Sequence, residues 1–293
     1  MIARARRWYD NQNQLIQTGI LLITIFIIRT FVFGLYQVPS GSMETTMLVG
    51  ERFIADKFTP LFKTIKRGEI ISFNDPNYAY SDNRIINLWQ HYVWGPSNWT
   101  KRVIGIPGDH IQGVIEEGKP VVYLNGKKLD EPYLNKYPII ALWTSKLHFT
   151  HGYWIGENSP VHRSYDPAKP YNEQPFYQIN PHYIVNHPQI AQILYPQTPG
   201  PQENDVFDVT LRNNEYWVMG DNRLGSWDSR GWGKLNGNLI HGKIVFRIFS
   251  FDTPVSPVDS FLPWTDWILI DLVLHPIEWI KRIRWSRCLQ FVA

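Results

Sequence analysis

The sequence predicts a mainly antiparallel β domain with an irregular inserted subdomain, preceded by one N-terminal transmembrane helix. Three observations lead to this fold class. A long apolar run lies near the N-terminus, and the body after it contains short runs of β-branched and aromatic residues separated by Gly, Pro, Asn and Asp. Within that body, Asn125-Gly126 stands between two apolar runs, which is a strong signal for a β-hairpin.

The apolar run at residues 18–36 reads TGILLITIFIIRTFVFGLY and carries one charge, Arg29. A helix of this length covers about 28 Å, close to the hydrocarbon thickness of a bilayer. The run is longer than the apolar part of a signal peptide and no small-residue cleavage site follows it, so we expect an uncleaved anchor. Arginines precede the run and carboxylates outnumber basic residues just after it. This asymmetry predicts a cytoplasmic N-terminus and a body on the outer side of the membrane.

The composition excludes several classes of protein. Of 293 residues, 44% are hydrophobic and 19% are charged, which allows a folded chain with an ample core. The net charge of +3 is too balanced to indicate a nucleic-acid-binding protein. A single cysteine, Cys288, excludes an internal disulfide and a Cys-based zinc cluster. We expect neither a metal nor a cofactor.

Shifts in composition divide the chain into five parts. We expect a basic cytoplasmic N-terminus (1–17), the anchor (18–36), a β core from two segments (37–133 and 214–252), a loop-rich insertion (134–213) and a C-terminal tail (253–293). Prolines concentrate in the insertion, among His, Tyr, Asn and Gln. The tail ends in WIKRIRWSRCLQFVA, whose aromatic and basic residues fit either a segment at a membrane surface or one packed on the domain.

Three clusters contain residues that could carry out chemistry. Ser40 and Ser42 lie in PSGSM, directly after the apolar run, where a hydroxyl could be exposed. In KRVIGIPGD, strand alternation puts Lys101 on one face with Val103. A lysine on an apolar face can lose its proton, because burial disfavours the ammonium form. The third cluster, GDNRLGSWDSRG, holds too few carboxylates for a calcium site, which usually takes about six to eight oxygens.

In this order and behind an N-terminal apolar run, the three clusters resemble the motifs of the type I signal peptidase family. PSGSM is similar to its nucleophile motif, KRVIGIPGD to its lysine motif and GDNRLGSWDSRGWG to its third motif. RGEIISF (67–73) and YLNGKKLDEPYL (123–134) resemble the segments between them. The resemblance extends from the anchor to Asp252 and implies a membrane-anchored serine endopeptidase with the signal-peptidase fold.

The resemblance also implies a role for each matched residue. Ser42 would be the nucleophile and Lys101 the general base, since a hydroxyl needs an adjacent base to attack an amide and a neutral lysine can serve. Ser40 and the backbone N–H of Ser42 would form the oxyanion hole, and Ser226 would orient the lysine amine. One departure from the family motif is Thr45, which replaces the usual proline, so we expect a less rigid loop there. The implied supports of the site are Arg102 paired with Asp221, and Asp228 paired with Arg230.

The implied substrates are secreted preproteins, from which the family removes signal peptides after a small-x-small motif, typically Ala-x-Ala. A nucleophile close to the anchor would lie at the outer surface of the bacterial inner membrane, where a translocated signal peptide ends. We expect an extended peptide to add as a strand and to fill shallow apolar pockets. By position, the candidate pocket walls are Tyr36, Val38, Met43, Met47, Phe53 and Thr100.

The expected partners are signal-peptide-bearing preproteins and the phospholipid bilayer, with no nucleic acid, and the expected state is a monomer. Two other interpretations stay open. Self-cleaving DNA-damage repressors have a related Ser/Lys fold, although they lack an anchor. A membrane-tethered peptide-binding relative could also keep the fold without the activity, and labelling of Ser42 by an acylating inhibitor would exclude that interpretation.

Overall fold

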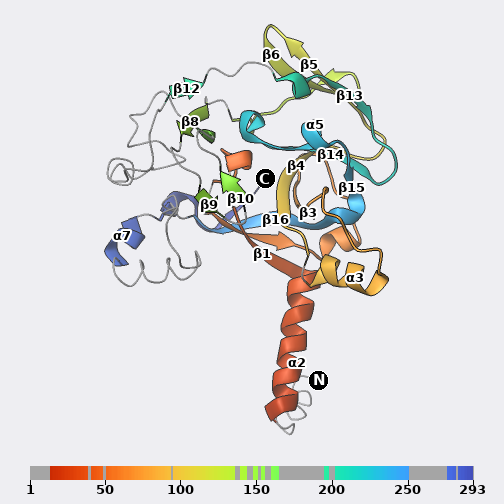
Figure 1. Ribbon diagram of the computed structural model, residues 1–293, viewed down its shortest axis with the longest axis vertical. Helices are drawn as coiled ribbons and strands as arrows, with labels where there is room; N and C mark the ends of the chain where they lie inside the picture. The colour runs from red at the N-terminus through yellow and green to blue at the C-terminus, as the bar shows by residue number, and fades with distance from the viewer. Residues whose placement is uncertain are drawn as a thin grey trace.

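The described residues of this computed structural model form mainly antiparallel β-sheets, which confirms the antiparallel β part of the predicted fold class. Figure 1 shows the body of sheets with helix α2 extending away from it. The structure describes residues 14–38, 41–48, 51–93, 95–135, 139–143, 148–150, 153–155, 160–164, 195–197, 202–250, 276–281 and 283–292.

The largest sheet has eight strands within the described ranges, in the order β1-β2-β16-β3-β4-β14-β15, with β17 paired to β16. This order interleaves early and late segments, so β4, which carries Lys101, lies between β3 and β14. The strands are β1 (Phe33–Gln37), β2 (Arg52–Asp56), β3 (Ile70–Asn74), β4 (Asn98–Gly105), β14 (Glu215–Met219), β15 (Leu235–Asn236), β16 (Ile240–Phe249) and β17 (Gln290–Phe291).

A second sheet has the order β13-β5-β6-β7, formed by β5 (His110–Glu116), β6 (Lys119–Leu124), β7 (Lys127–Lys128) and β13 (Phe207–Thr210). The predicted hairpin is confirmed between β6 and β7. Asn125 and Gly126 both have positive φ, 51° and 76°, as the tight turns that match strand twist require. An apolar cluster joins the two sheets, because Ile104 of β4 packs with Ile111 of β5.

Alternate side chains of β4 enter different parts of the core, as the sequence predicts. Val103 packs with Ile71 and Phe73 of β3, whereas Ile104 belongs to the cluster shared with the second sheet. Side chains two residues apart on a strand lie on the same face. Lys101 therefore lies on the Val103 face of the large sheet.

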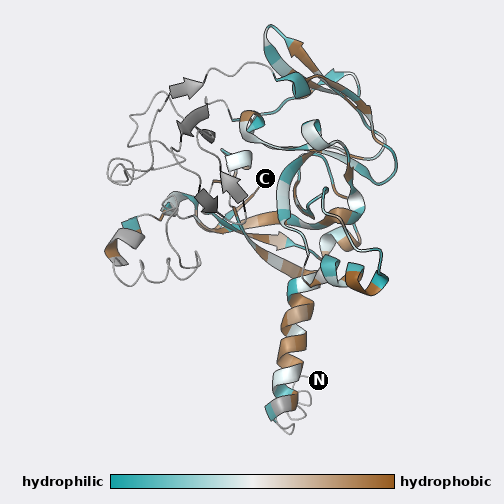
Figure 2. Ribbon diagram, in the orientation of Figure 1, coloured by the Kyte–Doolittle hydropathy of each residue, from teal (hydrophilic) through white to brown (hydrophobic). Residues whose placement is uncertain are grey.

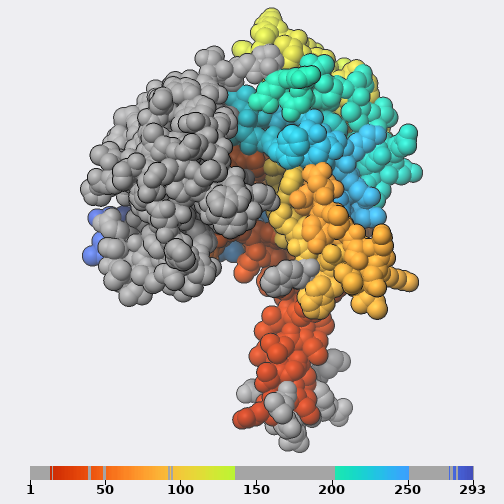
Figure 3. All heavy atoms as spheres, in the orientation of Figure 1, coloured from red at the N-terminus to blue at the C-terminus, as the bar shows by residue number. Residues whose placement is uncertain are grey.

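The N-terminal apolar run is helical over most of its length. Helix α2 (Gln14–Ile27) continues into a π-helical segment, η1 (Ile28–Val32). The predicted segment 18–36 is helical only to Val32, because the residues after it extend as β1 and pair with β2. Figure 2 shows apolar residues along α2, and Figure 3 shows its side chains standing clear of the body. In the part of the chain that the structure describes, no helix has the length and apolarity needed to cross a membrane.

The predicted insertion (134–213) ends earlier than expected, because β13 pairs with β5 and belongs to the second sheet. Apolar Phe207 and Val209 alternate with polar Asp208 and Thr210 in this strand, which is the pattern of a half-exposed strand. The described strands within the insertion are β8 (Ile139–Trp143), β9 (His148–Thr150), β10 (Tyr153–Ile155), β11 (Pro160–Ser164) and β12 (Tyr195–Gln197). β8 pairs with β11 and β12, and β9 pairs with β10.

The remaining described helices are short. The α-helices are α3 (Arg84–Tyr92), α5 (Ser229–Trp232) and α7 (Pro276–Lys281). The 3₁₀ turns are η2 (Gly41–Met43), η3 (Thr59–Leu61), η5 (Glu203–Asp205), η6 (Arg223–Gly225), η7 (Gly237–Leu239) and η8 (Trp285–Arg287). The nucleophile candidate Ser42 lies in η2, between β1 and β2.

Candidate active site

Ser42 and Lys101 meet although 59 positions separate them in the sequence. Lys101 Nζ lies 2.8 Å from Ser42 Oγ, which is hydrogen-bond distance. The lysine is 5% exposed, so this amine is almost fully removed from water. The turn η2 presents the hydroxyl, and the middle of β4 presents the amine from a strand with neighbours on both edges. An amine at this distance can accept the hydroxyl proton if it is neutral.

Burial lowers the pKa of Lys101 from 10.5 to about 8. The nearby carboxylates of Asp228 and Asp221 act in the opposite direction, and the positive charge of Arg230 adds to the lowering. Desolvation therefore outweighs the attraction of two carboxylates, in the direction that the apolar strand face predicts. A shift of this size corresponds to about 3 kcal/mol favouring the neutral amine. The environment makes a substantial neutral fraction of the lysine available near neutral pH.

The loop after β14 supports both catalytic candidates through two buried ion pairs. Arg102, next to Lys101 on β4, donates from Nε and Nη2 to the two oxygens of Asp221, each at 2.8 Å. Arg230 pairs with Asp228 at 2.9 Å and also with Asp205 at 2.6 Å. Burial alone would raise the pKa of the Asp228 carboxyl, but hydrogen bonding to Arg230 and its charge hold that pKa below its usual range. The pairings implied for these residues are present, and Asp205 is an additional partner.

Gly220 and Asn222 are two site residues that sequence reasoning missed. The backbone N–H of Asn222 donates to the Ser42 carbonyl at 3.1 Å, and its side-chain amide donates to the Gly41 carbonyl at 3.0 Å. A Cβ at position 220 would lie 2.5 Å from the Ser42 carbonyl oxygen, closer than real contacts allow. Glycine is thus required where the two loops touch. The signal available in the sequence was the GDN triplet, but it does not tell which loop these residues contact.

Ser226 lies beside this contact without touching Lys101 through a hydrogen bond. Its buried Oγ makes no hydrogen bond to Lys101, it packs against Gly220, and it lies near enough to the Asp228 carboxylate to help lower the pKa of that group. The lysine-orienting role implied for Ser226 therefore stays a prediction. Ser40, the implied oxyanion donor, lies outside the described residues.

The loop that follows Ser42 is held by two arginines from distant parts of the chain. Arg247 of β16 donates to the Thr46 carbonyl at 2.6 Å, and Arg287 of the tail donates to the same carbonyl at 3.0 Å. Arg287 also donates to the Thr45 carbonyl at 3.3 Å. On the opposite side, the Thr46 hydroxyl donates to Asp221 at 2.5 Å. The peptide group at the position where the family usually has proline is thus fixed by tertiary hydrogen bonds.

Glu51, which is fully buried, holds Arg287 in place beside this loop. Arg287 Nε donates to Glu51 Oε1 at 2.6 Å, and the Ser250 hydroxyl donates to the same oxygen at 2.8 Å. The other oxygen accepts from the Leu48 backbone N–H at 2.9 Å. β17 pairs with β16, so the described end of the tail packs on the domain, one of the two expected placements. The tail thereby places a cation beside the loop that follows Ser42.

Four of the six proposed pocket walls are core residues. Val38, Met43, Met47 and Phe53 are buried together in one apolar cluster, against which Tyr36 packs. Thr100 lies on β4, opposite Ser72 of β3. Apolar residues near a nucleophile can line a groove or fill the core beneath it, and hydropathy does not distinguish the two. In this structure these four side chains are buried in that cluster, and their assignment as pocket walls stays a prediction.

A hydroxyl and a buried amine at hydrogen-bond distance, on antiparallel sheets, define the kind of site found in serine hydrolases. Among the described residues, no three His, Cys, Asp or Glu side chains converge as metal ligands. The family model described as signal peptidase, peptidase S26, matches residues 12–249, well over half of the chain.

Three curated relatives are signal peptidases from different bacteria. Signal peptidase I of Buchnera aphidicola subsp. Acyrthosiphon pisum is 29% identical, over 79% of this chain and 73% of that protein. Signal peptidase I of Bacillus amyloliquefaciens is 27% identical, over 80% and 85%. Probable signal peptidase I-2 of Synechocystis sp. is 31% identical, over 81% and 75%. A crystal structure of a signal peptidase I from Enterococcus faecalis V583 covers 62% of this chain and 97% of that one, at 20% identity and a TM-score of 0.28.

The chain belongs to the signal peptidase family, peptidase S26. It is a serine endopeptidase of the type I signal peptidase kind, as the resemblance predicted.

Replacing Arg287 by methionine should lower the kcat for peptide cleavage roughly 10- to 100-fold while KM changes little. The reason is that this variant removes donors to the Thr45 and Thr46 carbonyls and leaves the loop that follows Ser42 less precisely placed. A displacement of about 1 Å can cost roughly 10²-fold in rate. Steady-state kinetics on a fluorogenic peptide would measure the effect.

The control for this prediction is Lys281→Met, which removes an exposed cation from helix α7 of the same tail. Its kcat should match that of the unmodified protein. Equal losses in both variants, or a change confined to KM, would contradict a positioning role for Arg287. The thermal midpoint of each variant shows whether the tail still packs on the domain.

Proposed function

We propose that the protein is a membrane-anchored signal peptidase that cleaves secreted preproteins after a small-x-small motif, with Ser42 as nucleophile and Lys101 as general base. The observation that carries this proposal is the 2.8 Å contact between the buried Lys101 amine and the Ser42 hydroxyl. The burial of the amine supports the role of base, because it lowers the pKa of Lys101 to about 8. The protein would work as a monomer.

In the first half of the reaction, the neutral Lys101 amine takes the Ser42 proton as Oγ attacks the scissile carbonyl carbon. The carbonyl oxygen becomes an oxyanion, which the Ser42 N–H and the Ser40 hydroxyl would stabilise. The Lys101 ammonium then gives its proton to the leaving amine of the mature protein, and the peptide bond breaks. The signal peptide remains as an ester on Ser42.

In the second half, a water molecule attacks the ester and Lys101 removes one of its protons. The proton returns to Ser42 Oγ as the ester bond breaks, so the signal peptide leaves with a free carboxylate and the enzyme is regenerated. The same amine serves as base, acid, base and acid in turn, and no further titrating group is needed. The ion pairs around Asp221 and Asp228 contribute by holding the two loops in place.

Cleavage of a preprotein tests this function directly. The full chain in detergent should convert a preprotein with an Ala-x-Ala signal sequence to its mature form, and N-terminal sequencing of the product should begin at the residue after that motif. A mixture of start sites, or no product, would contradict the proposal.

The rate of cleavage should depend on pH through Lys101. The base acts when it has lost its proton, so kcat/KM should rise about tenfold per pH unit below the pKa of about 8 and level off above it. A peptide assay between pH 6 and pH 10 would measure the profile. A rate that stays flat from pH 5 to pH 9 would contradict a titrating lysine base.

The proposed anchor is the apolar segment 18–36, with the N-terminus in the cytoplasm and the catalytic domain on the outer side of the bacterial inner membrane. Its support is the exposure of apolar side chains along α2, such as Leu22 and Ile23, each 61% exposed. A protein in water buries side chains of this kind, whereas lipid solvates them. The chain should stay with membranes during an alkaline carbonate wash, and its release into the supernatant would contradict anchoring.

A further inference from the structure

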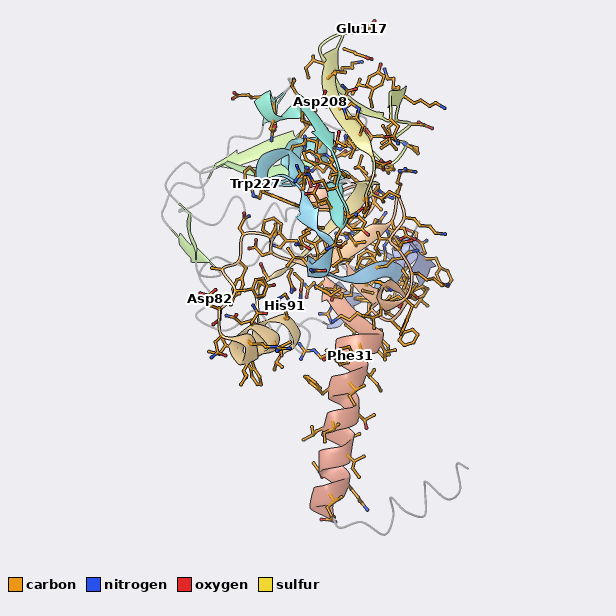
Figure 4. The ribbon with its side chains drawn as sticks, turned by 90° about the vertical axis from the view of Figure 1, so that its right-hand side faces the viewer. Phe31, Asp82, His91, Glu117, Asp208 and Trp227 are labelled. Atoms are coloured by element: carbon orange, nitrogen blue, oxygen red, sulfur yellow. The ribbon has the colours of Figure 1, made fainter. Side chains whose placement is uncertain are left out.

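A cationic cavity of about 220 Å³ lies where η1 meets the body, away from Ser42 and Lys101. Its walls come from η1, from the end of α3, from the loop after β2, and from the start of β16. Figure 4 shows the two sides, with Phe31 at the upper end of the helix and His91 on the neighbouring α3. A volume of this size holds roughly seven waters at about 30 Å³ each, enough for one small polar headgroup.

The formally charged side chains that line the cavity are all positive. Arg29 and Lys57 both line it, and none of the lining residues is Asp or Glu. Neither cation forms an ion pair with a carboxylate in the described part of the chain. Burial lowers the pKa of Lys57, and the positive charge of Arg29 lowers it further, so the two cations repel each other. A bound anion would relieve this repulsion and the cost of burying an unpaired charge.

Neutral donors complete the lining. Asn74, Gln90 and Asn98 also line the cavity, and the Gln90 amide is held by hydrogen bonds with Ser81 and Tyr78. His241 also lines it, with Nδ1 3.0 Å from the Tyr36 hydroxyl and with a buried Nε2 that makes no hydrogen bond to another described residue. If the tyrosine donates to Nδ1, the proton of the neutral ring lies on Nε2, and this N–H can donate to a ligand. Burial, followed by the charge of Lys57, lowers the pKa of His241 to about 3, which keeps the ring neutral.

We propose that this cavity binds the phosphate of an anionic phospholipid headgroup. The inference rests on the proposed anchoring, which puts η1, at the end of the apolar helix, at the level of the headgroups. Arg29 can extend its guanidinium along the helix to that level and bind phosphate oxygens through two N–H groups, while Lys57 acts as a point charge. Two cations without a carboxylate disfavour the ammonium group of a zwitterionic headgroup. The site therefore prefers phosphatidylglycerol to phosphatidylcholine.

The test measures thermal unfolding of the full chain in a neutral detergent with added lipid. Saturating short-chain phosphatidylglycerol should raise Tm by about 5 °C, whereas phosphatidylcholine and soluble glycerol 3-phosphate should have little effect. The variant Arg29→Gln/Lys57→Gln should lose the shift. The matched control Lys63→Gln/Lys66→Gln removes two exposed cations outside the cavity and should keep it.

Each other outcome overturns the proposal. If phosphatidylglycerol raises Tm of Arg29→Gln/Lys57→Gln as much as that of the unmodified chain, the lipid acts through non-specific attraction. If phosphatidylcholine raises Tm as much as phosphatidylglycerol, the site has no preference for an anionic lipid. An equal shift with glycerol 3-phosphate assigns the site to a soluble phosphate. Both double variants should cleave a preprotein in detergent at the rate of the unmodified chain. If the proposed function is wrong, the unmodified chain fails the cleavage assay, while the effect of lipid on Tm can still be measured.

Discussion

Replacing Ser42 by alanine or Lys101 by methionine should lower kcat for preprotein cleavage by a factor on the order of 10⁶, with the protein still folded. Without Oγ no acyl-enzyme forms, and without the amine the hydroxyl keeps its proton. Losses of this size follow when a nucleophile or its base is removed from other serine proteases. Neither change should unfold the protein, because methionine fills nearly the same buried space as lysine and alanine at position 42 removes one hydrogen bond, worth about 1 kcal/mol.

The two losses should not add. Because the hydroxyl and the amine act as one unit, the double variant Ser42→Ala/Lys101→Met should be about as slow as either single variant. Lys127→Met, which removes an exposed lysine from β7, is the matched control and should keep full activity. Gel analysis of preprotein turnover, with circular dichroism as a check of folding, would measure all four proteins. A Lys101→Met enzyme within tenfold of the unmodified rate would exclude the lysine as base.

Replacing Arg102 by methionine should lower the free energy of unfolding by about 3–5 kcal/mol. The side chains of Arg102 and Asp221 are 4% and 1% exposed, and their two-bond pair joins β4 to the loop after β14. Removal of the guanidinium leaves the Asp221 carboxylate buried, with a hydrogen bond from the Thr46 hydroxyl but without its cation. A buried charge without its partner is costly because neither water nor an opposite charge replaces the lost interaction.

Urea unfolding in detergent at pH 7 would measure this effect. Lys128→Met provides the comparison, since it breaks an ion pair with Glu116 whose side chains are 58% and 36% exposed, and such pairs contribute about 0–1 kcal/mol. Arg102→Lys, which keeps the charge but not the two-bond geometry, should fall between the two. A loss for Arg102→Met as small as that for Lys128→Met would show that water reaches Asp221.

Much of the fold could be predicted from local pattern. Alternation along β4 predicted that Lys101 and Val103 share one face, because side-chain direction in a strand repeats every two residues. Asn125-Gly126 predicted the hairpin between β6 and β7, because a tight turn depends on the backbone preference of its own residues. The predicted boundaries were less accurate. The helix ends at Val32 because the residues after it form β1, which pairs with β2. The insertion ends before β13 because β13 pairs with β5 of the second sheet. The composition of a segment does not predict which distant strand it pairs with.

The sequence by itself determined the antiparallel class, the family and the residue types able to cleave a peptide bond, because motifs such as PSGSM and KRVIGIPGD lie within short stretches. Only the tertiary structure decided how they meet. It brings Lys101 to Ser42, requires glycine at position 220 and places Arg287 beside the loop that follows Ser42. It also packs Met43 and Phe53 into one buried apolar cluster beside Ser42. Burial and long-range contact are properties of the packed chain, and here burial lowers the pKa of Lys101 to about 8.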